Sequence, residues 1–487
     1  MFVAGAWGLG PPGHSFTLLR QEENMLTKED VRARIASIVG EQNMLTKQED
    51  LVCYTYNAGG AAPSPHLPIL VALPGTAEEV AQMAAFCNAN KISIVPRSQG
   101  SGLSVNAIPE SDYSIIISMQ RMNSIVIDPE TLTAEVGPGA ITADIKKAAA
   151  EHGLMYPPDP ASFTFSSIGG NVGTDAGGLQ CVKYGTTKGY VSGMQVVLAS
   201  GDIIRCGGKC IKDVTGYNLT QLFTGSEGTL GIITEITLKL IPLPQAKRAI
   251  RVAFKEIENA AKAVSAIMTS GVVPSIMEFQ EQTLIRAVED YTHAGLPVDA
   301  GAMLLIEVDG DPSTLKPQAD VIRRVCEQLG MVDFHVAETP EEAEQLWKAR
   351  RSGLPALARV AKGRLGGDPA VPINKLAQAV HTLFEVGKKY GIKVSCQGHA
   401  GDGNIHPHFF FNSDEEKKTA AKARSEFHYE IIKMGGTVSA EHGVGREKAP
   451  YIVKQLGEAQ VGAMRAIKKA LDPNNILNPG CIFGGEA

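Results

Sequence analysis

The chain has 487 residues, a formal net charge of −6 and 20% charged residues. This length exceeds what one hydrophobic core usually supports, so it predicts two or more domains. The acidic balance and the lack of a large basic block argue against nucleic acid as the main partner. A small anionic substrate would then need local cations or a metal in order to bind.

The cysteines and the first residues bear on the cellular setting. The eight cysteines include no pair of Cys-x-x-Cys motifs, which argues against an iron–sulfur cluster or a structural zinc within the chain. Reduced thiols, without a convincing signal peptide or membrane span, predict a cytoplasmic protein. Asn-Met-Leu-Thr-Lys occurs at 24–28 and again at 43–47, which makes Met25 a candidate natural start. We therefore expect residues 1–24 to be a non-native or disordered extension.

After an N-terminal helical segment at 25–66, residues 67–244 combine many glycines with short apolar runs. A capping box formed by Thr76 and Glu79 predicts one helix, and Ala140–His152 is expected to be another. Strands are expected where apolar residues run together or alternate with polar ones, at Ile115–Met119, Val196–Ala199 and Ile232–Leu240.

Residues 245–450 have a different texture, in which longer helices alternate with strands. The expected strands are Met303–Val308, Val332–Val336, Lys393–Gln397, Asn404–Phe411 and Thr437–Ala440. The expected helices are Glu256–Ser270, Leu315–Gly330, Glu341–Arg350, Lys375–Tyr390 and Glu415–Met434. This order predicts an α+β sheet with helices on one face. Residues 451–487 add a helix near Ala459–Leu471 and a tail with an Asn-Pro-Gly turn at 478–480.

Three glycine-rich loops stand out in the first half, at 96–103, 168–178 and 225–231. Glycines beside Ser hydroxyls let backbone N–H groups approach a diphosphate closely. None of the loops matches the Rossmann fingerprint or the P-loop. A tight turn is the simpler explanation for each loop alone. A flat ligand that presses against the backbone better explains three such loops in one domain.

The strongest chemical signal lies in two glycine-flanked segments, 398–408 and 439–445, which hold four of the eleven histidines. Alternation along a strand starting at Asn404 would put Asn404, His406 and His408 on one face, and a turn could bring His399 to them. Imidazoles with one carboxylate make a three-ligand site that leaves positions open for substrate. A lone histidine is more often structural, but this clustering favours a metal centre.

These motifs, with Pro157-Pro158-Asp159-Pro160 and the Asn478-Pro479-Gly480 tail, resemble the vanillyl-alcohol oxidase/p-cresol methylhydroxylase superfamily. Within it, the sequence is most similar to the FAD-linked D-2-hydroxy acid dehydrogenase group, which includes glycolate oxidase flavoprotein subunits and D-lactate and D-2-hydroxyglutarate dehydrogenases. The resemblance implies an α+β fold, with a two-lobed FAD-binding domain at 67–244 and an α+β substrate cap at 245–450. It also implies that the C-terminal segment, 451–487, returns to the FAD-binding domain.

The resemblance further implies which residues bind FAD. Ser101 stands where relatives with covalently bound FAD often carry histidine, which suggests non-covalent FAD. The implied contacts are Pro96, Arg97, Ser98, Gln99, Gly100, Ser101 and Gly102 around the pyrophosphate; Pro158, Gly169, Gly170, Gly173, Thr174, Gly177 and Gly178 around the flavin; and Glu227, Gly228, Ile233 and Asn478 near its two ends.

For the second half, the resemblance implies that His399, His406 and Glu441 bind a divalent metal (Zn²⁺, Mn²⁺ or Fe²⁺) and that His442 is the catalytic base. Arg350 would bind the substrate carboxylate, and Asn404 and His408 would contact the substrate. Gly366 or Gly367 stands where 2-hydroxyglutarate enzymes carry a lysine, which favours a short acid such as D-lactate or glycolate. We expect His442 to remove the hydroxyl proton while the α-hydrogen leaves as hydride to the flavin.

Electrons would then pass to a separate partner, either an electron-transferring flavoprotein or an iron–sulfur subunit, which could hold the protein at a membrane surface. Direct quinone reduction is a further alternative, although no strongly amphipathic basic helix is evident. Three other functions remain open: a D-2-hydroxyglutarate-type dehydrogenase, a flavin-dependent sugar or lactone oxidase, and a non-catalytic FAD-binding subunit. A tightly bound metal would argue against the oxidase, and a colourless protein would favour the non-catalytic subunit.

Overall fold

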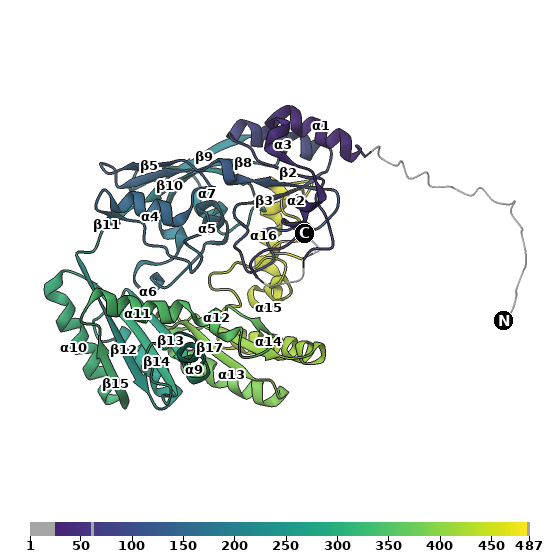
Figure 1. Cartoon of the computed structure of the whole chain (residues 1–487). Coiled ribbons are helices and arrows are strands. Elements are labelled where there is room, and N and C mark those ends of the chain that lie inside the picture. Colours follow the sequence, from purple (N-terminus) through teal and green to yellow (C-terminus); the bar gives the residue numbers. More distant parts are fainter. Residues whose placement is uncertain (1–24, 60–62, 485–487) are drawn as a thin grey trace, which may run out of the picture.

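The computed structural model describes residues 25–59 and 63–484, so the predicted extension at 1–24 lies outside the described residues. The chain folds into two halves of mixed helices and strands (Figure 1). The N-terminal half contains two sheets. The C-terminal half is built on one larger sheet, which we call the cap sheet. The domain limits drawn from the sequence stay predictions, although the first strand of the cap sheet begins at Ala246.

The first sheet of the N-terminal half has the strand order β1-β2-β4-β3, and β4 pairs in parallel with both β2 and β3. Thr76 accepts a hydrogen bond from Glu79 N, 3.2 Å away, and so caps α3. The predicted capping box is only half formed, because the Glu79 carboxylate accepts from Gly75 N instead of Thr76 N. The elements of this lobe are α1 (Lys28–Val39), η1 (Glu41–Asn43), β1 (Met44–Leu45), α2 (Gln48–Val52), β2 (Leu70–Ala72), α3 (Ala77–Ala89), β3 (Ser93–Arg97), β4 (Ser114–Ser118) and η2 (Met119–Arg121).

The second sheet is antiparallel, with the order β5-β6-β10-β8-β9. Alternation in β10 buries Ile232, Ile236 and Leu238, as its sequence predicts. The elements here are β5 (Ile125–Asp128), β6 (Thr133–Val136), α4 (Thr142–Ala150), β7 (Leu154–Met155), α5 (Ile168–Thr174), α6 (Cys181–Tyr184), η3 (Thr187–Gly189), β8 (Val191–Val197), β9 (Ile203–Gly207), α7 (Leu219–Phe223), β10 (Ile232–Lys239) and β11 (Ile241–Pro242).

The glycine-rich segment at 168–178 differs from its prediction, because its first part forms the short helix α5 instead of a loop. Burial of Ile168 and Val172 against the second sheet outweighs the low helix propensity of the glycines. Gly169 lets the helix approach the preceding turn, since a Cβ there would lie 2.8 Å from Pro138 O.

The cap sheet has the order β15-β12-β14-β13-β17-β18-β16, with antiparallel neighbours throughout. Its strands are β12 (Ala246–Phe254), β13 (Ile276–Glu281), β14 (Ala302–Gly310), β15 (Met331–Val336), β16 (Gly363–Gly366), β17 (Val394–His399) and β18 (His406–Phe411). Strands β12, β13 and β16 were not predicted. β18 begins at His406 instead of the predicted Asn404, which forms only an isolated bridge with Ala370.

Helices cover both faces of the cap sheet, whereas the sequence predicted one. The long helices α8 (Ile257–Met268), α10 (Pro312–Gln328), α13 (Leu376–Tyr390) and α14 (Asp414–Lys433) share one apolar core with the sheet. The shorter helices α9 (Gln282–Thr292), α11 (Pro340–Arg351) and α12 (Gly353–Leu357) pack on the opposite face, near the N-terminal half. Polar side chains of β13, β17 and β18 point to this second face.

The predicted strand at Thr437–Ala440 is wrong, because this segment forms only isolated bridges with Asp368 and Ala370. Thr437 and Ala440 make backbone hydrogen bonds to Ala370 and Asp368, but Val438 N donates to a side chain, Gln455 Oε1, so no continuous ladder forms. The segment is therefore an extended loop held from the side, followed by the residues of the second histidine motif. Two 3-10 turns, η4 (Ile373–Lys375) and η5 (Ala400–Asp402), complete this half.

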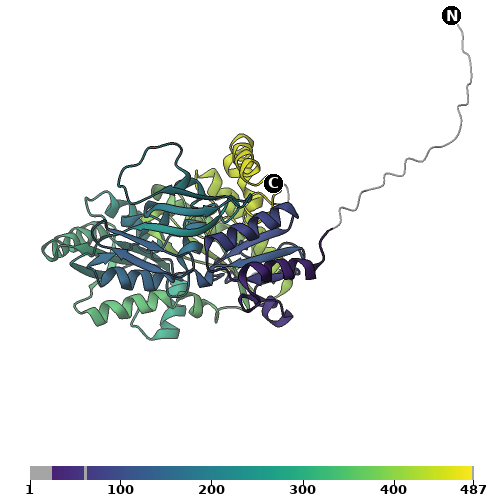
Figure 2. The same cartoon turned by 90° about the horizontal axis from the view of Figure 1, so that it is seen from above.

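The C-terminal segment returns to the N-terminal half, as expected. After η6 (Ala449–Tyr451), α15 (Ile452–Leu456) and α16 (Glu458–Leu471), the tail lies beside β3. Ile94 N donates to Ile476 O at 2.7 Å, and Asn478 N donates to Ile94 O at 2.8 Å. Seen from above, the yellow C-terminal helices lie beside the purple and blue N-terminal elements (Figure 2). None of the helices within residues 25–59 and 63–484 has the length and apolarity needed to cross a membrane.

Candidate functional site

A cavity of about 450 Å³ lies between the glycine-rich segments and the cap. Its floor comes from β3, α5 and the start of β10, and Leu354, Pro355 and Arg351 of the cap line it from the other side. Glu441 and His442 also line it. The predicted cofactor residues on its wall are Pro96, Arg97, Ser98, Gln99, Gly100, Ser101, Gly102, Gly169, Gly170, Gly173, Thr174, Gly177, Glu227, Gly228 and Ile233.

Three predicted cofactor residues, Pro158, Gly178 and Asn478, are not part of this wall. A Cβ at Gly178 would lie 2.2 Å from Asp159 O, so this glycine permits two loops to pack together. Asn478 donates through Nδ2 to Asn106 O and Glu227 O, each at 2.7 Å. Asn478 thereby fixes the backbone of Asn106 and Glu227, two residues that do line the cavity.

The glycines of the wall leave room that fits a flat cofactor. A Cβ at Gly177 would lie 2.7 Å from Glu441 Oε2, so only glycine lets the carboxylate of the cap come this close to the wall. A Cβ at Gly173, in contrast, would have no protein atom within 4 Å. Open space beside a backbone in a lined cavity is what an isoalloxazine ring needs, so the donor set and the shape fit FAD.

Glu227 joins the two halves. Its backbone is left-handed (φ 51°), and its buried carboxylate accepts hydrogen bonds from Val444 N at 2.7 Å and from Gly445 N. Asn106 Nδ2 donates to it at 3.0 Å. Burial raises the pKa of the Glu227 carboxyl, although these hydrogen bonds oppose the shift. The end of the second histidine segment is thereby fixed to the third glycine-rich segment.

Three imidazoles converge on one oxygen of Glu441. The Nε2 atoms of His399, His406 and His442 lie 3.2, 3.4 and 3.5 Å from Glu441 Oε1. His406 and His442 stack with their ring centroids 5.3 Å apart, and His399 meets His406 edge-on at 5.0 Å. The histidine-rich segments, far apart along the chain, therefore form a single cluster at the cavity wall.

The electrostatics of the cluster follow from burial and from its two acidic partners. Burial works against charge on His399, but Glu278 and Glu441 raise the pKa of His399 well above its usual value. Burial lowers the pKa of His406 to about 4. For Glu441, burial alone would raise the pKa, but the neighbouring imidazoles lower it to about 2. Neutral His406 beside the Glu441 carboxylate is in the state that binds a divalent cation, whereas His399 would release a proton on binding one.

Glu278, which sequence reasoning missed, orients both His399 and Arg350. Its carboxylate is fully buried, lies 2.6 Å from His399 Nδ1, and accepts from Arg350 Nε at 2.7 Å. Arg350 Nη2 also contacts it. The only sign of Glu278 in the sequence is that a carboxylate stands within a mostly apolar run, the buried strand β13. Carboxylate contacts of this kind hold a metal-binding histidine with its other nitrogen outward.

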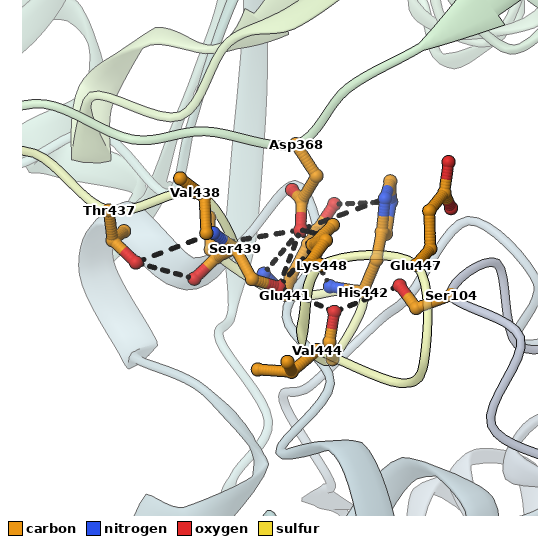
Figure 3. A network of polar contacts seen from close by, with 12 residues as sticks. Ser104, Asp368, Thr437, Val438, Ser439, Glu441, His442, Val444, Glu447 and Lys448 are labelled. Atoms are coloured by element: carbon orange, nitrogen blue, oxygen red, sulfur yellow. Dashed lines mark hydrogen bonds and ion pairs between the residues drawn. The ribbon is translucent and has the colours of Figure 1, made fainter. Parts of the chain in front are cut away.

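Asp368 is a second residue that sequence reasoning missed, and it holds the loop that carries Glu441 and His442 (Figure 3). Its buried Oδ2 accepts hydrogen bonds from the backbone N–H groups of residues 440, 441 and 442, at 3.1, 3.1 and 2.8 Å. Lys448 Nζ donates to the same oxygen at 3.1 Å, and Ser439 Oγ at 3.3 Å. Burial works against the charge of Asp368, but His442 and Lys448 lower its pKa far below the usual range.

The remaining predicted substrate residues lie beside the cluster. Asn404 donates to Asp368 Oδ1 at 3.3 Å. His408 lies on the same face of β18 as His406, and its Nδ1 is 3.3 Å from Arg364 Nη1. Burial lowers the pKa of His408 well below its usual value, and the charge of Arg364 acts in the same direction. Arg350 is buried beneath the wall, whereas its exposed neighbour Arg351 lines the cavity.

The residues of the cluster fit a divalent metal. His406, Glu441, His442 and Asp368 each offer a ligand atom within 4.8 Å of the others, and His399 Nε2 is 3.2 Å from Glu441 Oε1. Asp368 was not a predicted ligand. Its Oδ2 already accepts four N–H donors, which makes it a weaker candidate than the imidazoles. The ligand set drawn from the sequence stays a prediction.

Comparisons with known proteins agree with this architecture. A family model described as "FAD binding domain" matches residues 68–207, and one described as "FAD linked oxidases, C-terminal domain" matches residues 243–482. The chain is 41% identical over 466 residues to the glycolate oxidase subunit GlcD of Bacillus subtilis, covering 95% of this chain and 98% of that protein. It is 35% identical over 418 residues to a D-lactate dehydrogenase of Anaerostipes hadrus, covering 83% and 87%.

Solved structures show the fold independently of close sequence similarity. The chain superposes on p-cresol methylhydroxylase with a TM-score of 0.78 at 22% identity, covering 93% of this chain and 96% of that one. For 4-ethylphenol oxidase from Gulosibacter chungangensis the TM-score is 0.77 at 18% identity, with the same coverage. These findings confirm the resemblance drawn from the glycine-rich motifs. The protein is an FAD-linked oxidoreductase, and it belongs to the family of FAD-linked oxidases with the p-cresol methylhydroxylase type of FAD-binding fold.

Proposed function

We propose that the protein is an FAD-dependent dehydrogenase that oxidises a short 2-hydroxy acid, D-lactate or glycolate, to the 2-oxo acid. The observation that carries the proposal is the convergence of three imidazoles on Glu441 at the wall of a glycine-lined cavity. A glycolate oxidase subunit and a D-lactate dehydrogenase among the relatives support this substrate class. Gly366 or Gly367 stands where the resemblance places a lysine in 2-hydroxyglutarate enzymes, and the missing lysine favours a monocarboxylate.

We assign His399, His406 and Glu441 as the ligands of a divalent metal. Glu278 holds His399 through Nδ1, which leaves Nε2 directed at Glu441. A metal at this point would act as a Lewis acid toward an α-hydroxy acid. Zn²⁺, Mn²⁺ and Fe²⁺ all suit two imidazoles and a carboxylate.

The base in this proposal is His442. Its side chain is 25% exposed, against 7% and 12% for His399 and His406, and it lines the cavity. Asp368 accepts from the backbone N–H of His442 and lies 3.7 Å from its Nδ1, so this carboxylate fixes the backbone of His442 and faces its imidazole. His442 Nε2 would take the hydroxyl proton. Arg350 stays the predicted carboxylate-binding residue, and it would bind the substrate while its guanidinium also pairs with Glu278.

FAD, when bound along the glycine-lined wall, supplies the redox chemistry by accepting the α-hydrogen of the substrate with its electron pair. Leu354 and Pro355 of the cap add apolar surface to the cavity wall, which would help to keep water away from the reacting atoms. One proton goes to His442 and one hydride equivalent goes to the cofactor, which balances the conversion of a 2-hydroxy acid to a 2-oxo acid.

We propose that the electrons then leave to a separate protein, such as an electron-transferring flavoprotein or an iron–sulfur subunit. Two relatives, from Bacillus subtilis and Escherichia coli, are named as subunits of glycolate oxidase, which supports a partner. All eight cysteines are free in the structure, and they are spread over both halves.

The test is anaerobic reduction of the bound flavin by D- and L-lactate, glycolate, malate and 2-hydroxyglutarate, followed by absorbance. His442→Gln should retain flavin and lose at least about 100-fold in reduction rate, since general-base catalysis contributes that much or more. His381→Gln, at an exposed position of α13, is the matched control. Chelation should suppress reduction, and added metal should restore it. Reduction by none of the acids, or an unchanged rate in His442→Gln, would reject the proposal.

A further inference from the structure

Arg364 is a partly buried arginine of β16 whose guanidinium contacts a histidine. Within the described residues, its guanidinium is paired with no carboxylate, and its Nη1 lies 3.3 Å from His408 Nδ1. Arg364 and Gly366 lie on the same face of β16, and a Cβ at Gly366 would lie 3.6 Å from Arg364 Nη1. The Arg364 guanidinium therefore lies next to the space that a side chain at position 366 would enter, and it contacts His408.

This contact determines which nitrogen of His408 carries the proton. A guanidinium only donates hydrogen bonds, so Nδ1 of His408 must be the acceptor. An imidazole that accepts at Nδ1 is neutral and carries its hydrogen on Nε2. Arg364 thus presents His408 as a donor through Nε2–H.

That donor is buried and has no partner in the described part of the chain. His408 is 2% exposed, and its Nε2 makes no hydrogen bond to described residues. Buried polar groups in native proteins are nearly always paired, so an unpaired one calls for a ligand. Other unpaired atoms lie on the same face of the sheet: Gln397 Oε1 and both side-chain amide atoms of Gln280. Gln397 pairs with His406 across β17 and β18.

The position of His408 relative to the histidine cluster suits a small substrate. His406 and His408 are two residues apart on the same face of β18, so their Cα atoms lie about 7 Å apart. Asn404 and Arg350, the other expected substrate contacts, already have carboxylate partners in Asp368 and Glu278. Among the expected substrate contacts, His408 Nε2–H is therefore the donor left open beside the cluster; Gln280 Nε2 is a second unpaired donor on the same face.

We propose that Arg364 is a positioning residue for substrate recognition, which holds His408 in the tautomer that donates from Nε2 to the carboxylate of a 2-hydroxy acid. This inference rests on the proposed function for the identity of the ligand. The tautomer of His408 can be measured without substrate turnover, so this part of the inference is tested separately. Arg364 need not touch the substrate.

The first measurement is the ¹⁵N spectrum of histidine-labelled holoenzyme, with the His408 signal identified by its loss in His408→Gln. The wild type should show His408 protonated at Nε2, and Arg364→Met should lose this preference. Arg364→Lys should restore it in part, because an ammonium also donates to Nδ1. A wild-type His408 protonated at Nδ1 would overturn the inference.

The second measurement is binding of oxalate, a dicarboxylate probe without an α-hydrogen that cannot reduce the flavin, followed by the change in flavin absorbance. Arg364→Met should weaken binding about tenfold, the value of one hydrogen bond to a charged group, with flavin and metal content unchanged. The KM for the reactive acid should rise more than kcat falls. Arg359→Met, at an exposed arginine five residues earlier, should bind as the wild type does.

A double variant separates positioning from general damage. The amide nitrogen of Gln reaches the place of Nε2, so His408→Gln should make binding insensitive to Arg364→Met. If Arg364→Met weakens oxalate binding equally in the wild type and in His408→Gln, the inference is overturned. If the acids reduce the flavin but Arg364→Met binds oxalate normally, the inference fails and the proposed function stands. If none of the acids reduces the flavin, the proposed function fails, and the ligand assignment fails with it.

Discussion

Replacing Asp368 with Asn should damage the site without touching a proposed ligand. Oδ2 of Asp368 accepts from three successive backbone N–H groups and from Lys448, at 2.8 to 3.1 Å. Asn keeps one acceptor and loses the charge, while its amide nitrogen would face Asn404 Nδ2, which is another donor. Lys448, which is 5% exposed, would keep its charge without a carboxylate partner. Breaking a buried pair of this kind costs about 3–5 kcal/mol in the free energy of unfolding.

The same change should also displace the loop that carries Glu441 and His442. A shift of about 1 Å in a catalytic group can cost about 100-fold in rate, so flavin reduction should slow by that order. The assays are chemical denaturation, metal content and anaerobic flavin reduction. Asp299→Asn, at an exposed loop position, is the control. Asp368→Asn with unchanged metal content and reduction rate would refute the view that this carboxylate holds the loop in place.

Three further predictions test other parts of the site. Gly173→Ala should lower flavin content, because the space that its Cβ would enter is the space that we assign to the cofactor. Gly189→Ala is the control, since its Cβ also has room but lies outside the cavity. Equal flavin content in the two variants would contradict the placement of FAD. Glu278→Gln should weaken metal binding about 10–100-fold in competition with a chelator, and an unchanged affinity would contradict the role of Glu278 in orienting His399. Burial raises the pKa of Asp159 to about 7. At pH values between about 4 and about 7 the folded state therefore binds more protons than the unfolded state. The free energy of unfolding should fall as the pH rises through this window. Asp159→Asn should therefore gain about 1–2 kcal/mol on the wild type between pH 5 and pH 8, allowing for partial contact with solvent, and parallel pH profiles in denaturation would contradict this.

Local patterns in the sequence predicted much of the chemistry. The glycines at 96–103, 168–178 and 225–231 mark places where the backbone approaches something closely, and most of them line the cavity. Alternation along β18 predicted that His406 and His408 share a face. These features depend on residues next to one another in the chain, which is why they could be read without a fold. The glycine helix α5 was missed because its packing partners are distant.

What only the tertiary structure decided is the set of residues that act through others. Glu278 lies 121 positions before His399, and Asp368 lies 74 positions before His442, yet each pair is in direct contact. A single carboxylate inside an apolar strand gives no sign of its partner, and neither does Arg364 in its short edge strand. Residue type and spacing therefore determined which side chains can carry the chemistry. The pairing of strands β13, β16, β17 and β18 decided which groups orient them, because contacts across a sheet depend on register and not on distance along the chain.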